Sequence, residues 1–137
     1  MKAIAKEWLK AAHDDILVID RIYHDELLSH MVAFHAQQCV EKSFKAILED
    51  NEIEFPKIHK LRRLQEMLPV SIQNVNEEIV STLDELYIDS RYPGNMGLLP
   101  YGKPTLEDAK EFYDFAQKIF DEVCTLLNIP TPEIKSL

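Results

Sequence analysis

The sequence has little glycine, little cysteine and no long apolar run, and each shortage excludes a class of protein. Only three of the 137 residues are glycine, while seven proline residues are gathered in four places, which disfavours a fold of many short strands joined by turns. Cys39 and Cys124 are too few for a disulfide scaffold, and each lies in an apolar helical pattern typical of a buried thiol. Without a signal peptide, a targeting segment or an apolar run near about 18 residues, the sequence predicts a cytoplasmic protein that does not enter a membrane.

Positive charge is also scarce. The chain has 15 Lys and Arg against 24 Asp and Glu, which gives a formal net charge of −9. The summed field of such a chain repels phosphate backbones and anionic membranes, so general nucleic-acid binding is disfavoured. The length and the hydrophobic fraction of 46% are typical of one globular domain, here residues 1–137, with its own core.

Apolar residues recur at spacings of three and four along most of the chain and predict an all-α fold. The pattern predicts long helices at about 2–21, 27–51, 72–89 and 105–127, with a short helix at about 58–68. Proline residues and the Gly/Pro-rich stretch 91–104 separate these helices, because proline interrupts a helix. The architecture we expect is an up-and-down antiparallel bundle of four long helices plus one short helix.

The second of these helices differs from the others. Over 31–40 its apolar groups point in every direction, which indicates a central helix that is either buried deep in the core or shared with a second subunit across a two-fold axis. Its far half is expected to be amphipathic, with Glu41, Lys42, Lys45 and Glu49 on the polar face.

Capping residues mark the start of the last two long helices. Either Ser71 or Asn74 suits the start of the fourth, and Thr105 with Asp108 resembles a capping box for the last.

A basic cluster precedes the acidic fourth helix: Lys57, Lys60, Arg62 and Arg63 surround His59 with no acid among them. Local pairing with an anion outweighs a field that salt screens beyond about 10 Å, so the cluster suits a phosphate or nucleotide. The alternative is a solvated helix face that makes surface salt bridges to the fourth helix.

Other polar residues have weaker claims to chemistry. His35, Gln37 and Gln38 lie in the uncharged half of the second helix, where they either line a pocket or bond to neighbouring side chains in the core. Zinc binding is disfavoured because His30 and His35 are five residues apart and no zinc motif is present. The remaining histidines of the first half are expected to be exposed: His13 and His24.

Arg91 follows the fourth helix and precedes the Gly/Pro-rich stretch. It can pair with Asp89 or Glu85 or bind a ligand, and residue type alone favours the ion pair.

Four sequence segments, in their order along the chain, resemble a HEPN domain (higher eukaryotes and prokaryotes nucleotide-binding). The resemblance covers nearly the whole chain. The strings that carry the resemblance are WLKAAHDD from residue 8, FHAQQCVEKSFKAIL from 34, PKIHKL from 56 and SRYP from 90. The resemblance implies a bundle of four main helices plus a short one, often a homodimer. It also implies that the chain acts with a minimal nucleotidyltransferase, as many prokaryotic members do.

Many HEPN proteins are ribonucleases with an Arg and a His separated by four to six residues, of which the first is usually polar. That pair suits attack of a ribose 2′-hydroxyl on its phosphate, since one group moves protons and a fixed cation meets the charge on phosphorus oxygens. Arg91 matches the family's Arg, but residues 96–98 are Met, Gly and Leu, residue 92 is Tyr, and no His follows His59. Tyr92 and Tyr101 are poor substitutes for that His, because the pKa of an ordinary phenol is about 10.

The resemblance therefore implies a non-catalytic binding protein without cofactor or metal, in which the ligand-binding residues are Arg91, Tyr92, His59, Lys60, Gln38 and Lys42. Its expected partners are a nucleotide, a minimal nucleotidyltransferase and a second copy bound through the second helix. The alternative is a divergent, metal-independent, toxin-like ribonuclease that uses Arg91 with His59. A scaffold that only assembles through the second helix is a third possibility.

Overall fold

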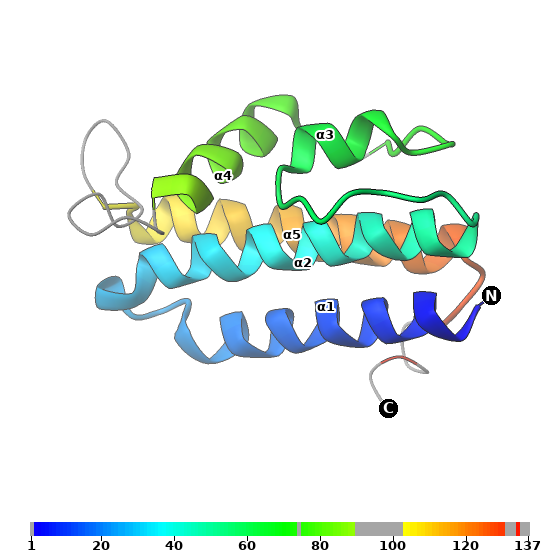
Figure 1. Ribbon diagram of the computed structural model, residues 1–137. Helices are drawn as coiled ribbons and strands as arrows, with labels where there is room; N and C mark the ends of the chain where they lie inside the picture. Colours follow the sequence, from blue (N-terminus) through cyan, green and yellow to red (C-terminus); the bar gives the residue numbers. More distant parts are fainter. Residues whose placement is uncertain (1, 74, 90–102, 131–133, 135–137) are drawn as a thin grey trace.

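The computed structural model describes residues 2–73, 75–89, 103–130 and 134, and within them every regular element is helical. The elements are listed here in chain order: α1 (Ala3–Ile22), the 3-10 turn η1 (Glu26–Leu28), α2 (Ser29–Asp50), α3 (Leu61–Glu66), α4 (Glu77–Asp89) and α5 (Leu106–Leu126). Successive long helices run in opposite directions, and the short α3 lies between α2 and α4 in the sequence (Figure 1). The prediction of an all-α bundle is confirmed.

Helix α2 is the centre of the bundle. It packs against α1 on one side and α3 and α4 on the other, and α5 lies along a third side (Figure 1). Phe44, Ile47 and Leu48 are among its buried core side chains, and apolar burial of this kind is the main stabilising contribution to such a fold. The prediction that the second helix is central is confirmed.

The far half of α2 has the predicted polar face, but part of that face is buried and not solvated. Glu41 and Lys45 are 3% and 5% exposed, although both carry formal charge. The chain that leaves α2 turns back and runs along that helix before α3 begins (Figure 1). This return segment, residues 51–60, covers the face that periodicity alone assigns to solvent.

Helix starts follow local capping chemistry. At α5 the Thr105 hydroxyl accepts from the backbone N–H of Asp108, whose carboxylate accepts from the N–H of Thr105, so the predicted capping box is confirmed. At α4 the Asn76 side chain accepts from the N–H groups of Glu78 and Ile79 at 3.0 and 3.1 Å. Ser71 is exposed, well before α4, and does not cap it. The other candidate, Asn74, lies outside the described residues.

Two further predictions are corrected: the bounds of the short helix and the exposure of His13. The short helix spans only Leu61–Glu66, because Asp84 of α4 accepts the N–H groups of Leu61 and Arg62 and so defines its first turn. His13 is 5% exposed and packs against the ring of Phe120, whereas His24 is exposed as expected.

Cys39 and Cys124 are buried, as predicted, and neither forms a disulfide. Burial also raises the pKa of the Cys39 thiol well above its usual range, because the thiolate would lose its hydration. None of the helices in the described part of the chain combines the length and the apolar character that a membrane span requires.

Candidate functional site

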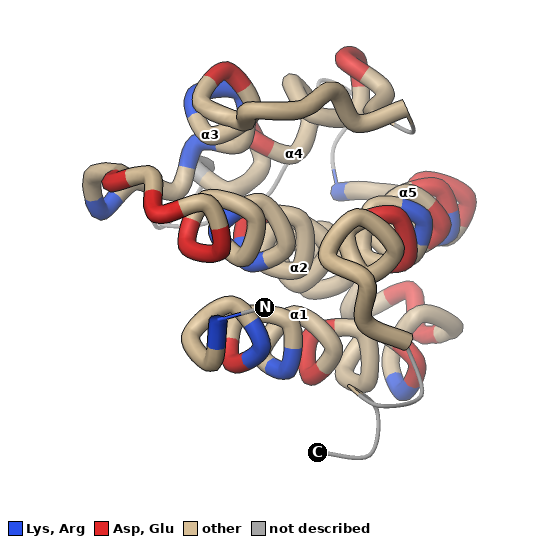
Figure 2. Tube along the Cα trace, turned by 90° about the vertical axis from the view of Figure 1, so that its right-hand side faces the viewer, with Lys and Arg blue, Asp and Glu red and all other residues tan. Residues whose placement is uncertain are grey.

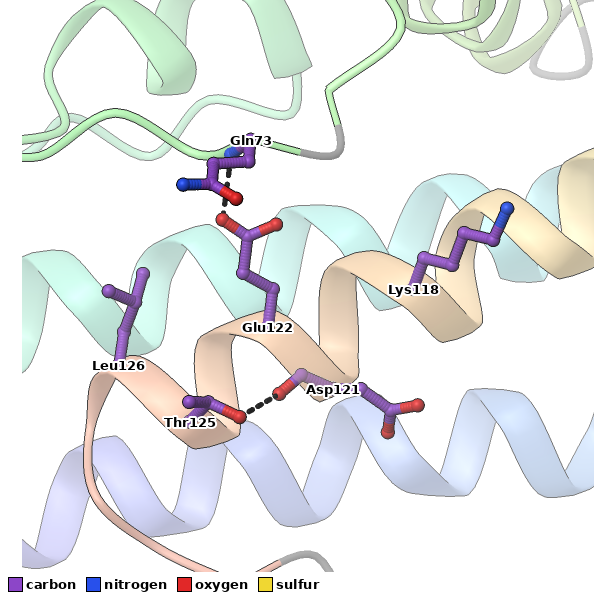
Figure 3. Close-up of a pocket in the computed structure, with 6 residues that line it drawn as sticks. All are labelled: Gln73, Lys118, Asp121, Glu122, Thr125 and Leu126. Atoms are coloured by element: carbon purple, nitrogen blue, oxygen red, sulfur yellow. Dashed lines mark hydrogen bonds between the residues drawn. The ribbon is translucent and has the colours of Figure 1, made fainter.

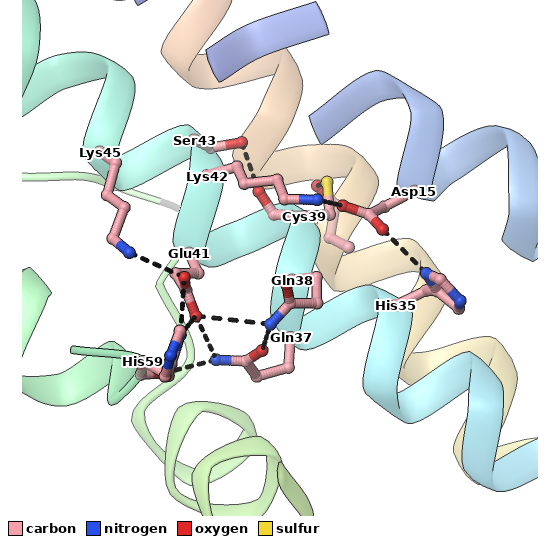
Figure 4. A network of polar contacts seen from close by, with 11 residues as sticks. Asp15, His35, Gln37, Gln38, Cys39, Glu41, Lys42, Ser43, Lys45 and His59 are labelled. Atoms are coloured by element: carbon pink, nitrogen blue, oxygen red, sulfur yellow. Dashed lines mark hydrogen bonds and ion pairs between the residues drawn. The ribbon is translucent and has the colours of Figure 1, made fainter. Parts of the chain in front are cut away.

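One face of α2 carries three polar side chains one turn apart: Gln37, Glu41 and Lys45 (Figure 4). Positions i, i+4 and i+8 of a helix share a face, so these groups form a row, which we call the anchor row. The Lys45 ammonium lies 2.9 Å from a Glu41 oxygen, and the Gln37 amide donates to the other Glu41 oxygen at 3.1 Å. The row is buried, and its contacts satisfy groups that would otherwise be costly to remove from water.

The anchor row holds the return segment that carries His59. The His59 ring places Nδ1 3.2 Å from both carboxylate oxygens of Glu41, and the His59 carbonyl accepts from the Gln37 amide at 2.6 Å. Nearer the start of the segment, the Phe55 ring lies 5.8 Å from the Lys45 ammonium, which also faces the Trp8 ring at 5.4 Å. The His59 side chain is itself 45% exposed, so a fixed imidazole is presented to solvent.

A hollow of about 260 Å³ lies beside this imidazole. Its lining residues come from the return segment and α4: Ile58, His59, Lys60, Asp84 and Tyr87. The rings of His59 and Tyr87 have centroids 5.3 Å apart. The hollow therefore combines two aromatic rings with a cation and a carboxylate.

Asp84 joins the two walls of the hollow. Its oxygens accept from the N–H of Leu61 at 2.7 Å and of Arg62 at 3.2 Å, so α4 is bonded to the start of α3. Burial raises the pKa of the Asp84 carboxyl, since the charged form is partly removed from water, and the two backbone N–H bonds only partly offset this. The same bonds hold the start of α3 against α4, on which Tyr87 lies.

The aromatic surface extends from the hollow to the middle of α2. The Phe34 ring is stacked on Tyr87 with centroids 5.9 Å apart, and it meets the His35 ring edge-on at 5.2 Å. All four rings of the series from His59 through Tyr87 and Phe34 to His35 are only partly buried or exposed. Such a series offers ring faces on which another planar group can stack.

A second buried carboxylate lies on the other side of α2. Asp15 of α1 accepts from the Lys42 ammonium at 2.8 Å, and its other oxygen lies 2.8 Å from His35 Nδ1 (Figure 4). This contact joins α1 to α2 and does not involve the return segment.

The structure brings together only some of the residues that the sequence proposed as ligand-binding. His59 and Lys60 line the hollow, and Gln38 reaches the anchor row, because its amide donates to the Gln37 oxygen at 2.7 Å. Lys42 instead points to Asp15, away from His59 (Figure 4). Arg91 and Tyr92 lie outside the described residues, and so does the suggested pairing of Arg91 with Asp89 or Glu85.

Sequence reasoning missed three residues that build the site: Glu41, Asp84 and Tyr87. Helical periodicity gave the first a solvated face, and the other two looked like ordinary members of an acidic amphipathic helix. One feature of the sequence could have pointed to Glu41: it is an acid followed four residues later by Lys, with an isolated His after the end of the helix.

The contacts of the polar residues favour one of the alternatives that the sequence left open. His35, Gln37 and Gln38 bond to neighbouring side chains, and none of them lines the hollow. Within the basic cluster, Arg62 makes the expected surface contacts to α4, to Glu77 at 3.4 Å and to the Ser81 hydroxyl. Figure 2 shows basic residues on α3 and before it, while α5 carries both acidic and basic residues. Lys60 thus remains the cation of the cluster that borders the hollow.

Another hollow, of about 470 Å³, lies along α5 (Figure 3). Its lining includes Lys118, Asp121 and Glu122, and the Glu122 carboxylate accepts from the backbone N–H of Gln73 at 2.7 Å. None of the ligand-binding residues proposed from the sequence lines it.

Among the described residues, no three His, Cys, Asp or Glu side chains are grouped as metal ligands would be. A scan against protein-family models matches residues 5–127 to the family described as HEPN domain. Searches of curated proteins and of solved structures gave no match.

Proposed function

Because the chain belongs to the HEPN domain family, we propose that it binds a nucleotide at the hollow beside His59 and does not cleave RNA through the family's Arg–His pair. The observation that carries this proposal is the hollow itself, in which a fixed imidazole, an ammonium group and a tyrosine ring converge.

The size and lining of the hollow suit a nucleobase. Sites for drug-sized ligands usually measure about 300–1,000 Å³, so a hollow of about 260 Å³ accepts one ring system and leaves a sugar and phosphates outside. Base stacking on an aromatic side chain is worth about 1–3 kcal/mol, and Tyr87 and His59 both present rings there. Lys60 provides a cation for a phosphate, and Arg91 follows the end of α4 by two residues in the sequence.

The proposal of a non-catalytic protein rests on the missing proton carrier. Arg91 has no His after it, and His59 is the last histidine in the chain. Loss of a positioned acid–base group typically lowers a rate by about 10²–10⁴-fold. A binding role for the same cations needs no such group.

We also propose that the protein works as an accessory subunit, as a homodimer through α2 and with a minimal nucleotidyltransferase. Its support is two partly buried apolar side chains on α2: Phe34, which belongs to the aromatic surface, and Met31, one turn before it. Light scattering on wild type and Met31→Glu tests the dimer: the wild type should have twice the chain mass and the variant the mass of one chain. A wild-type monomer would contradict it.

Calorimetric titration with ATP, GTP, CTP and UTP tests the binding site. We expect at least one of them to bind, and Lys60→Ala to weaken that binding by about 10–100-fold, as expected for loss of one charge-assisted contact. Lys57→Ala is the matched control, because this exposed lysine belongs to the same cluster but does not line the hollow. Equal losses in the two variants would show attraction to general charge and would contradict the site.

One observation favours a second function, the divergent ribonuclease. A carboxylate bonded to Nδ1 of an imidazole fixes its tautomer and orientation, as in many catalytic histidines, and Glu41 does this for His59. Cleavage of RNA in the presence of EDTA that is lost in both Arg91→Ala and His59→Ala would establish it. Intact RNA after incubation with the wild type would exclude it.

A further inference from the structure

We infer that Glu41 is the positioning residue of the nucleotide site: it holds the His59 imidazole through Nδ1, so that Nε2 is the nitrogen left to meet a ligand. The inference rests on the proposed function for the meaning of the site, but its main test needs no ligand. It concerns a buried residue that does not line the hollow.

The donors around Glu41 determine which way the hydrogen bond to His59 runs. The Lys45 ammonium and the Gln37 amide both donate to this carboxylate, at 2.9 and 3.1 Å. An ionised carboxylate can only accept. His59 Nδ1, which lies 3.2 Å from both carboxylate oxygens, must therefore carry the proton that it shares with Glu41.

The opposite nitrogen is then the acceptor of a neutral ring. The structure gives His59 Nε2 no hydrogen bond to any described residue, and the side chain is 45% exposed. A ligand that donates a hydrogen bond, such as a base amino group or a ribose hydroxyl, fits this nitrogen. The tautomer set by Glu41 thus decides which hydrogen-bonding partner His59 offers.

The anchor row also fixes where the ring lies. The Gln37 amide donates to the His59 carbonyl at 2.6 Å, while Glu41 bonds to the His59 ring. Side chains from two adjacent turns of α2 therefore fix this one residue. Lys45 in turn holds Glu41 and is enclosed by the rings of Trp8 and Phe55. With its rotation restricted in this way, the imidazole loses less entropy when a ligand binds.

Long-range ¹H–¹⁵N spectra of the histidine rings test the inference directly. In the wild type, neutral His59 should carry its proton on Nδ1. A neutral wild-type ring that is protonated on Nε2 would overturn the inference without any variant.

The variants are chosen so that the fold survives. Removing Glu41 alone strands a buried ammonium, so the test uses Glu41→Met with Lys45→Met, which replaces a buried ion pair by straight apolar chains of similar volume. The control is Lys45→Met alone, which keeps the carboxylate. We expect the Nε2–H form to become the major tautomer of His59 in the double variant and the Nδ1–H form to persist in the control.

His35 is an internal reference in each spectrum, because its Nδ1 bonds to Asp15 and not to Glu41. Its signals should be unchanged. An unchanged His59 in the double variant would overturn the inference, as would the same change in Lys45→Met, which would assign the effect to packing around residue 45.

Affinity provides the second readout. The dissociation constant of the nucleotide that the wild type binds should rise about tenfold in the double variant, and it should rise less in Lys45→Met, which keeps the Glu41 carboxylate. If the wild type binds no nucleotide, the proposed function fails, while the tautomer of His59 still decides whether Glu41 positions it.

Discussion

Two buried carboxylates of this bundle, Asp15 and Glu41, have the same partners in kind but hold different parts of the chain. Each bonds to one lysine ammonium and to Nδ1 of one histidine. Asp15 joins two regular helices, since both of its partners lie on α2. Glu41 joins α2 to the irregular return segment through His59.

The difference shows why equal chemistry can have different consequences. Extensive apolar packing already fixes α1 against α2, so the Asp15 contacts add to an interface that exists without them. The first three residues of the return segment bond back to the end of α2, but the rest of it is not helical, and its His59 carbonyl is bonded by the Gln37 amide of the anchor row. We therefore expect the Asp15 contacts to affect stability and the Glu41 contacts to affect the site.

The largest loss of stability should come from removing the Glu41 carboxylate. Glu41→Met leaves the Lys45 ammonium buried between two aromatic rings without its carboxylate, and such losses cost about 3–5 kcal/mol of folding free energy. Urea denaturation measures it, and adding Lys45→Met should recover most of the loss. A single variant as stable as the wild type would show that the ammonium has another partner.

Removing the charge of Asp15 should destabilise the protein less. Asp15→Asn removes the charge that holds Lys42 and His35, but those side chains are 23% and 19% exposed and can turn to water. We expect a loss of about 1–2 kcal/mol by the same denaturation, with nucleotide affinity unchanged. A loss of affinity as large as that of the Glu41 and Lys45 double variant would remove the distinction between the two carboxylates.

Asp84 is a third carboxylate to compare with Asp15 and Glu41, because it caps α3 from another helix. Asp84→Ala should cost about 1–2 kcal/mol, as for other lost caps, while Asp84→Asn keeps an acceptor and should cost less. Equal losses would argue against the capping role.

The pH dependence of Asp84 gives a second test of the same residue. Its pKa is raised on folding, so the folded form takes up a proton at a higher pH than the unfolded chain does. Stability contributed by this group therefore increases as the pH falls through the folded pKa toward the unfolded value. As the pH falls across the acidic range, the denaturation midpoint of the wild type should rise relative to that of Asp84→Asn. A constant difference between the two midpoints would contradict this.

The smallest effect is expected at a surface pair. Arg62→Ala removes a contact to Glu77 in which the two side chains are 43% and 58% exposed. Pairs of this kind contribute about 0–1 kcal/mol, so the melting temperature should barely change. A loss comparable with that of Asp15→Asn would show that exposure does not separate the two kinds of pair.

The sequence predicted the fold well because the signals that determine it are local. The spacing of apolar residues located four long helices, and the hydroxyl and carboxylate of Thr105 and Asp108 marked the start of α5 correctly. The prediction failed where distant chain covers a surface. Glu41 and Lys45 were assigned to solvent because periodicity cannot show that residues 51–60 fold back over them.

The site was predicted less completely for the same reason. His59 and Lys60 were found through an unusual local charge pattern, and they do border the hollow. Tyr87 and Asp84 are more than 20 residues away, and their place beside His59 depends on how α4 packs on α2. Such a contact leaves no periodic or compositional trace in one sequence.

Chemical-shift mapping tests the central claim most directly. Titrating the ¹⁵N-labelled protein with the nucleotide that binds in calorimetry should shift the amide signals of Ile58 to Lys60 and of Tyr87, which border the hollow. Shifts confined to Gln73, Lys118 and Glu122 around the α5 hollow, or no shifts with any of the four nucleotides, would contradict the account.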